Sequence, residues 1–163
     1  MSNKIFASDR FRDHALLLLR LVAGLLFFQA GARKLFGWYG GMPNGATIAL
    51  ASQVGIGAVM EVIGGVAIAV GLFTRPIAFI LSGEMAVAYW QFHSPKGAWP
   101  IINGGQPAVL FCFLFLYLAA TGAGRFSVDA FIARVRSNRA GAESNADGSG
   151  RHRRGVLVDE EVA

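Results

Sequence analysis

Four apolar stretches constrain the fold of this chain more than any other feature of its sequence. They run roughly over His14–Ala32, Val54–Phe73, Pro76–Phe92 and Pro107–Gly122. An α-helix needs about 20 residues to cross the hydrocarbon core of a bilayer, and the last two stretches lie at the short end of that range. The chain is also 54% hydrophobic and only 15% charged, which is too apolar for an ordinary soluble domain. The sequence therefore predicts an all-α integral membrane protein, a transmembrane four-helix bundle.

The basic residues predict how this bundle is oriented. Most of them flank one end of the expected helices: Lys4, Arg10, Arg12, Arg75, Arg125, Arg134, Arg136 and Arg139. The opposite side carries only Arg33, Lys34 and Lys96. Because cytoplasmic loops are enriched in Lys and Arg, both termini are predicted to be cytoplasmic. The net charge of +5 then belongs to segments beside the lipid bilayer, and no nucleic-acid partner is expected.

Composition divides the chain into four segments. A basic cytoplasmic segment (1–13) precedes the transmembrane domain (14–124), an amphipathic interfacial helix (125–136) follows, and a disordered cytoplasmic tail (137–163) ends the chain. The interfacial helix is expected because Val128, Phe131, Ile132 and Val135 share one helical face flanked by arginines. The tail is expected because Gly, Ser, Asn and Arg dominate there.

Three charged residues, Arg20, Glu61 and Glu84, interrupt the apolar stretches. A charge at membrane depth usually faces the bundle interior, pairs with another charge or serves a functional site. Side chains tilt toward the N-terminus of their own helix, so Arg20 and Glu84 both lean toward the cytoplasm and Glu61 leans away. This predicts an Arg20–Glu84 ion pair and leaves Glu61 without an obvious cation. Snorkelling of Arg20 to the lipid headgroups is the alternative.

The position of Glu61 near the membrane midplane suggests two roles. Removal from water favours the neutral form of a carboxyl group, so Glu61 is either a hydrogen-bonded packing residue or a proton carrier with a catalytic part. Glu61 and Glu84 together also permit a small proton-coupled transporter, which would require a homo-oligomer because four spans are few for a monomeric pathway.

The outer end of the third stretch carries candidate ligand-binding residues. Gln91, His93, Lys96 and Trp99 offer hydrogen-bonding groups and a stacking face for a quinone headgroup. The alternative is an aromatic belt with ordinary interfacial polar residues. The single cysteine, Cys112, excludes an internal disulfide, a C-x-x-C pair and a cysteine-ligated cluster. No metal site and no nucleotide motif is evident, and quinone is the one candidate cofactor.

Several motifs, in order, resemble the DoxX family over about residues 14–129. They are the run Leu17–Phe27 with Gly31, Lys34 and Phe36-Gly37-Trp38, then Glu61-Val62-Ile63-Gly64-Gly65 and Gly71–Arg75, then Gly83–Tyr89, His93–Gly97 and Asn103-Gly104-Gly105, and finally Ala120–Arg125. Each motif is weak alone, and their joint order and spacing are specific.

The resemblance implies a multi-pass protein of the bacterial cytoplasmic membrane with four helices. It also implies a membrane subunit or anchor of a redox complex, quinone- or thiol-linked, with a soluble redox partner on the cytoplasmic side. Because the chain has no redox cysteine pair, a quinone or a partner protein must carry any electrons, and both a catalytic and a non-catalytic subunit of a membrane oxidoreductase stay open. A non-enzymatic membrane scaffold is the alternative.

Overall fold

The computed structural model describes residues 2–43 and 48–141. Within these ranges it describes the side chains from residue 9 onward. Throughout this described part the chain forms helices and turns and no strand. The chain divides into two units, one ending at Asp129 and the other beginning at Ala130. The all-α class predicted from the sequence is confirmed.

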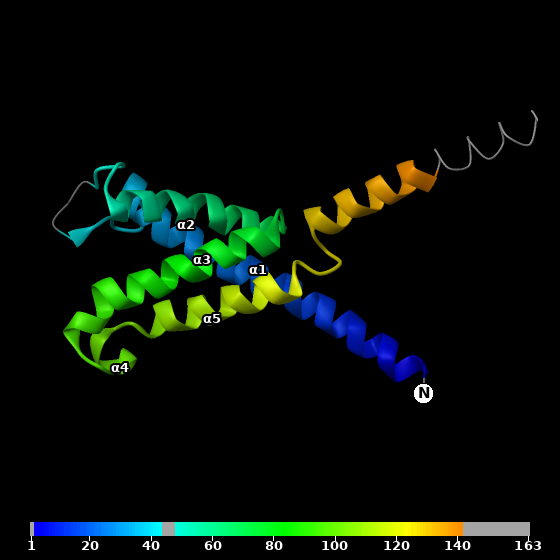
Figure 1. Ribbon diagram of the computed structural model, residues 1–163, viewed down its shortest axis with the longest axis horizontal. Helices are drawn as coiled ribbons and strands as arrows, with labels where there is room; N and C mark the ends of the chain where they lie inside the picture. Colours follow the sequence, from blue (N-terminus) through cyan, green and yellow to red (C-terminus); the bar gives the residue numbers. More distant parts are fainter. Residues whose placement is uncertain (1, 44–47, 142–163) are drawn as a thin grey trace, which may run out of the picture. The chain divides into compact units, whose positions relative to one another are not determined.

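The first unit consists of helices in chain order (Figure 1). They are α1 (Ser2–Phe36), α2 (Gln53–Val70), α3 (Thr74–Ala88), a π-helical turn (Tyr89–His93), a 3₁₀ turn (Ser94–Lys96), α4 (Pro100–Asn103) and α5 (Gln106–Thr121). α1 packs along α2, and α3 packs along α5. α2 and α3 also contact each other, and a short turn connects them. The four long helices coincide with the four apolar stretches, although α1 begins well before the first stretch.

Glycines bring α1 and α2 into backbone contact. A methyl group added at Gly24 would lie 2.4 Å from the carbonyl oxygen of Gly65, and one added at Gly31 would lie 2.6 Å from that of Ala58. Small residues at these positions therefore allow the two antiparallel helices to approach closely, as in packed membrane helices. This contact fixes which residues of α1 face which residues of α2.

The turn between α2 and α3 is capped by a residue from far along the chain. Gly71 ends α2 in the left-handed conformation (φ +74°), and Phe73 precedes α3 with φ +45°, which is unfavourable for a residue with a side chain. The carboxylate of Asp129 accepts hydrogen bonds from the backbone N–H groups of Phe73 (2.8 Å) and Thr74 (2.9 Å). The N–H of Asp129 donates to the Gly71 carbonyl at 2.9 Å. Asp129 thus serves as the N-cap that α3 lacks locally.

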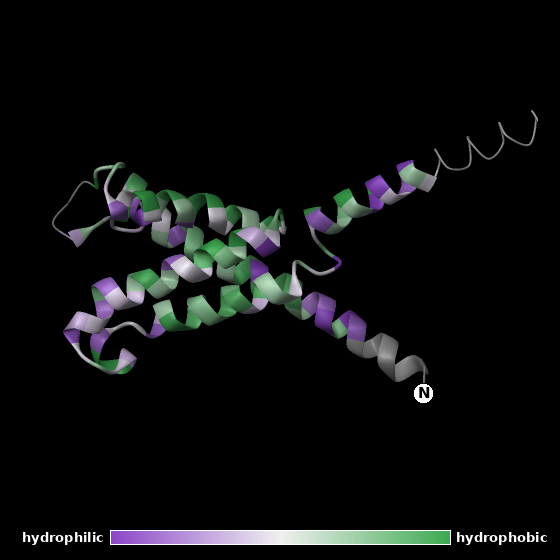
Figure 2. Ribbon diagram, in the orientation of Figure 1, coloured by the Kyte–Doolittle hydropathy of each residue, from purple (hydrophilic) through white to green (hydrophobic). Residues whose placement is uncertain are grey.

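The interior is aromatic and aliphatic, and so are the outer faces of the helices. Phe27 meets Phe115 edge-on, with ring centroids 4.8 Å apart, among buried residues that include Ile68, Leu81 and Leu118. Large apolar side chains are also exposed on all four long helices, for example Leu18, Ile63, Phe79, Leu110 and Phe113. Figure 2 shows hydrophobic residues along these helices and hydrophilic ones toward the start of α1.

Within residues 2–43 and 48–141, two helices are long and apolar enough to cross a membrane: residues Asp9–Phe36 of α1, and α2. α5 is apolar but shorter. The two long helices correspond to the first and second apolar stretches of the sequence.

A further helix covers residues 128–141, and its exposed side chains include Phe131. It extends beyond the interfacial helix predicted for 125–136, so residues 137–141 are helical where a disordered tail was expected. Residues 142–163 of the predicted tail lie outside the described residues. Placement of this helix at the membrane surface stays a prediction.

The glycine contact between α1 and α2 can be tested with Gly24→Ala. The added methyl group meets a backbone oxygen that cannot move independently, so we expect a loss of about 1–3 kcal/mol in the free energy of unfolding. Thermal unfolding in detergent measures the change. Gly83→Ala is the matched control, because nothing lies within 4 Å of the added group and a helix favours alanine. Equal effects of the two substitutions would contradict the proposed contact.

The remote cap can be tested with Asp129→Ala. Loss of an N-cap side chain costs about 0.5–2 kcal/mol, and the freed N–H groups of Phe73 and Thr74 should exchange faster with solvent deuterium. Hydrogen exchange followed by mass spectrometry of the α2–α3 turn measures this. Asp9→Ala is the control, because Asp9 is an exposed aspartate of α1. It should leave hydrogen exchange at the α2–α3 turn unchanged.

Candidate functional site

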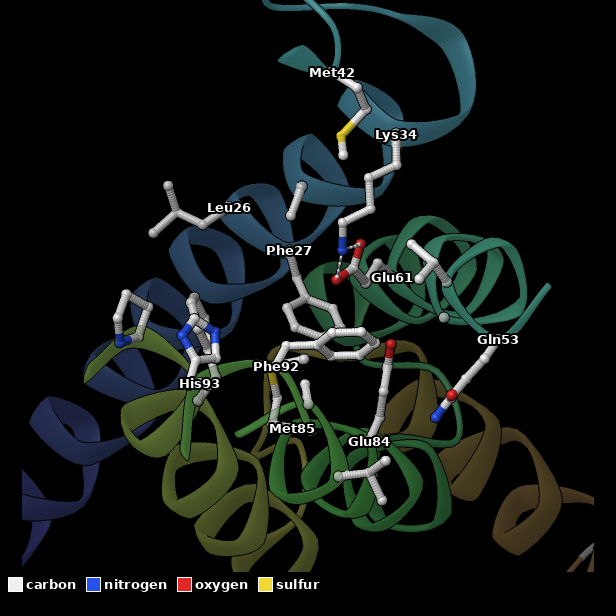
Figure 3. Close-up of a pocket in the computed structure, with 18 residues that line it drawn as sticks. Leu26, Phe27, Lys34, Met42, Gln53, Glu61, Glu84, Met85, Phe92 and His93 are labelled. Atoms are coloured by element: carbon white, nitrogen blue, oxygen red, sulfur yellow. Dashed lines mark hydrogen bonds and ion pairs between the residues drawn. The ribbon is translucent and has the colours of Figure 1, made fainter. Parts of the chain in front are cut away.

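A cavity of about 490 Å³ lies between the helices of the first unit. Its volume falls in the range of small-molecule binding sites, and its wall is mostly apolar. α1, α2, α3 with its π-helical turn, and α5 all contribute side chains, ten of which are labelled in Figure 3. The apolar part of the wall includes Leu26, Phe27, Met85, Phe92 and Phe111. The polar part consists of Lys34, Gln53, Glu61, Glu84 and His93.

Lys34 and Glu61 form an ion pair at this wall. The Lys34 ammonium donates to both carboxylate oxygens of Glu61, at 2.5 Å and 2.7 Å (Figure 3). The Glu61 side chain is buried, whereas Lys34 keeps partial contact with solvent. The prediction that Glu61 lacks a cation is therefore wrong. The first predicted stretch ended at Ala32, but α1 continues to Phe36 and carries Lys34 to the level of Glu61.

Glu84 lies on the α3 side of the same cavity, and in Figure 3 its carboxyl group points toward the side that holds Lys34 and Glu61. The absence of a side chain at Gly57 leaves room for it, since a methyl group there would lie 3.0 Å from Oε1 of Glu84. Within the described part of the chain, the buried Oε2 of Glu84 has no hydrogen-bond partner. The charges that act on Glu84 are those of Glu61 and Lys34. The cavity therefore contains one paired and one unpaired carboxyl group.

The predicted ion pair between Arg20 and Glu84 does not form. Arg20 is fully buried, and its Nη2 donates to the backbone carbonyl of Phe126. Its guanidinium lies against Gly71 at the end of α2, where the charge of Asp129 acts on it. Because the close contact of α1 with α2 sets Arg20 level with Gly71, the arginine is at the opposite end of α2 from Gly57, beside which Glu84 lies. Arg20 instead holds the segment that carries Asp129.

His93 reaches the cavity through an irregular stretch of helix. The π-helical turn Tyr89–His93 widens the end of α3, and both Phe92 and His93 line the cavity. Turns of this kind are frequent at functional sites. The ring of His93 stacks on Tyr89, and its Nδ1 lies 3.2 Å from the carbonyl oxygen of Asn103. Asn103 is buried and ties the following loop together through bonds to Gly97 and Gly105.

The other residues predicted to bind a ligand lie outside the cavity. Lys96 and Trp99 are exposed and do not line it. Gln91 is also exposed, but its side chain accepts a hydrogen bond from Gln53, which does line the cavity. Among residues 2–43 and 48–141, no three His, Cys, Asp or Glu side chains gather in a way that could hold a metal ion.

Comparison with known proteins shows which family this chain belongs to. The model of the family named DoxX matches residues 15–94, a range that includes Lys34, Glu61, Glu84 and His93. A Haemophilus influenzae protein named "Uncharacterized protein" is 37% identical over 124 residues, which cover 74% of this chain and 92% of the relative. The chain belongs to the DoxX family. A Bacillus subtilis protein of similar sequence, named "Putative oxidoreductase CatD", is 28% identical over 123 residues, covering 75% of this chain and 90% of that relative.

No solved structure shows a significant match to this DoxX chain. The arrangement of its cavity therefore comes from the present structure alone.

The ion pair predicts a specific pattern of stabilities. Lys34→Met leaves the buried Glu61 carboxyl without its cation, and such a loss costs up to about 3–5 kcal/mol when the remaining charge cannot be neutralised. Adding Glu61→Gln to Lys34→Met should recover much of that loss, since the unpaired charge is removed. Unfolding of the three variants in detergent checks the pattern.

Lys96→Met is the matched control for Lys34→Met, because Lys96 is exposed. We expect it to change stability by less than about 0.5 kcal/mol, as surface substitutions usually do. A double variant less stable than Lys34→Met alone would show that the two side chains do not depend on each other.

Proposed function

We propose that this DoxX protein is a multi-pass protein of the bacterial cytoplasmic membrane, built as a transmembrane four-helix bundle. The exposed apolar side chains on α1, α2, α3 and α5 support this, since a soluble protein rarely exposes apolar patches of such extent. α3 contributes 15 residues and the π-helical turn another 5, so together they approach the length of a span.

Both termini of the described bundle are proposed to be cytoplasmic. Arg20, the α2–α3 turn with Arg75, and the segment around Arg125 belong to one end, joined by the bonds of Arg20 to Phe126 and of Asp129 to the turn. Clustered basic residues favour the cytoplasmic side. The cavity with Lys34 and His93 then opens toward the outer half of the membrane.

The protein is further proposed to be a membrane subunit or anchor of a redox complex, with a quinone ring held in the cavity. The single observation that carries this is the apolar cavity whose wall contains an ion pair and an unpartnered carboxyl group. The relative named "Putative oxidoreductase CatD" supports a redox role. A bound quinone would supply the electron-carrying chemistry, for which this chain, with one cysteine, has no thiol pair.

The residues present fit such a ligand. Phe27, Phe92 and Phe111 supply apolar faces for a ring, while Lys34 and Glu84 supply polar contacts at its edge. Lys34 retains one N–H after bonding both oxygens of Glu61, and Glu84 lines the same cavity. A soluble oxidoreductase on the cytoplasmic side is proposed to complete the complex, because the single cysteine leaves this chain without a thiol pair of its own.

A proton-coupled transporter is the second candidate, because the cavity brings Glu61 and Glu84 together. Proton uptake into liposomes that contain only this protein would favour it over the redox subunit.

Photolabelling tests the quinone site. Protein in lipid nanodiscs is irradiated with an azido-ubiquinone analogue, and labelled peptides are identified by mass spectrometry. We expect labelling in peptides that contain Phe27, Phe92 or Phe111, suppressed by excess decylubiquinone. Ala88→Trp, which fills the cavity from the α3 side, should reduce this labelling severalfold, whereas Val66→Trp on the exposed face of α2 should not. Labelling spread evenly over lipid-facing peptides would refute the site.

A further inference from the structure

The side of the cavity between α2 and α3 is closed at two levels. The amide of Gln53 on α2 donates a hydrogen bond to the side-chain oxygen of Gln91 in the π-helical turn. One turn further along α2, Glu84 occupies the space that Gly57 leaves, since a methyl group at Gly57 would lie 3.0 Å from its Oε1. A ligand that passed between these two helices would have to break or displace these contacts.

The side between α1 and α5 is closed at one level. Phe27 of α1 packs against Phe111 and Phe115 of α5, with ring centroids 5.5 Å and 4.8 Å apart. In the part of the chain that the structure describes, the closely packed helix pairs are α1 with α2 and α3 with α5, and no hydrogen bond joins α1 to α5. Past the Phe27 ring, toward the end of α1, the two helices are therefore free of any such bridge.

Apolar residues line the cavity beside this unbridged side. Leu26 and Ala30 lie four residues apart on α1, as do Pro107 and Phe111 on α5, so each pair shares one helix face. Leu26 is 49% exposed although it lines the cavity, so it lies where the wall meets the surroundings. In Figure 3 it lies across the cavity from Gln53. For a bundle that spans a bilayer, an opening with such a lining faces hydrocarbon.

The cavity is too small for the whole of a long-tailed quinone. Its volume of about 490 Å³ suits a drug-sized molecule. A membrane quinone adds to its ring a hydrocarbon tail of repeated isoprenoid units, so the tail has to leave the cavity when the ring is inside. Because hydrocarbon is unfavourable in water, the tail leaves at least cost through an apolar opening into lipid.

We propose that the opening between α1 and α5, beside Leu26 and Phe111, admits the quinone ring from within the bilayer and holds its hydrocarbon tail. The inference rests on the proposed quinone site, and it names the class of ligand as a lipid-soluble molecule with a small polar ring and a long apolar tail. The ring lies toward Lys34, and the tail lies against the exposed apolar side chains next to the opening, Leu25 of α1 and Leu110 of α5.

A photoreactive tail tests this route. Protein in lipid nanodiscs is irradiated with a ubiquinone analogue that carries a diazirine at the end of a decyl tail, and the labelled residues are located by mass spectrometry. Labelling is counted where excess decylubiquinone suppresses it, which removes the signal of analogue that is merely dissolved in the lipid. We expect suppressible labelling to be severalfold higher on α1 and α5 than on α2 and α3.

Two variants test the opening itself. Leu26→Trp crowds the opening from α1, so it should lower the suppressible tail labelling severalfold. Ile56→Trp is the matched control, because Ile56 is exposed to a similar degree on α2 and does not line the cavity. It should leave the tail labelling unchanged. Both substitutions replace exposed side chains, and the labelling pattern of the unmodified protein tests the route without either of them.

The azido-ubiquinone analogue, which labels from the ring, separates failure of the route from failure of the site. If the ring labels the cavity but the tail labels α2 and α3 as strongly as α1 and α5, the route is wrong and the quinone site stands. Tail labelling that decylubiquinone does not suppress, or an equal effect of the two tryptophan variants, overturns the route in the same way. Absence of suppressible labelling from both ring and tail overturns the quinone site and the inference with it.

Discussion

The backbone contact between α1 and α2 determines which residues of α2 the two charged residues Arg20 and Lys34 of α1 lie beside. Gly24 against Gly65 and Gly31 against Ala58 hold the two helices at a separation that no larger residue permits. With that register set, Lys34 at the end of α1 comes level with Glu61, and Arg20 comes level with Gly71. The two basic residues therefore lie at different levels of the α1–α2 pair. One completes an ion pair at the cavity, and the other anchors the chain after α5.

Most of the helical framework could be predicted from the sequence, because each apolar stretch has the length and composition of a helix. The partners of the charged residues could not, because the sequence does not show which residues of one helix lie level with which residues of the next. The cation that Glu61 meets is Lys34, near the C-terminal end of α1 and far along that helix from Arg20. The missed signal was Leu35-Phe36, which continues the apolar pattern of α1 past Lys34. The capping role of Asp129 could not be predicted, because its partners, Phe73 and Thr74, are distant in sequence.

In the candidate site, too, the features set by a residue's own helix could be predicted, whereas those set by distant residues could not. His93 was predicted as a ligand-binding residue and does line the cavity, but Lys96 and Trp99, its neighbours in sequence, do not. The reason is the loop after the π-helical turn, which Asn103 holds in place through bonds to Gly97 and Gly105. No periodic pattern in the sequence predicts this loop conformation. The site is thus assembled from helix faces, and the loop supports one of them.

The π-helical turn at Tyr89–His93 has a consequence for how such a cavity diverges among relatives. A turn of this type accommodates one additional residue without interrupting the helix, so it rotates everything after it relative to Glu84. Loss of a single residue here would restore the ordinary α-helical phase and turn His93 to another face of the helix. The part of the wall before the turn, which includes Glu84, would stay as it is. A one-residue deletion would therefore change the lining of the cavity, with no exchange of side chains elsewhere in its wall.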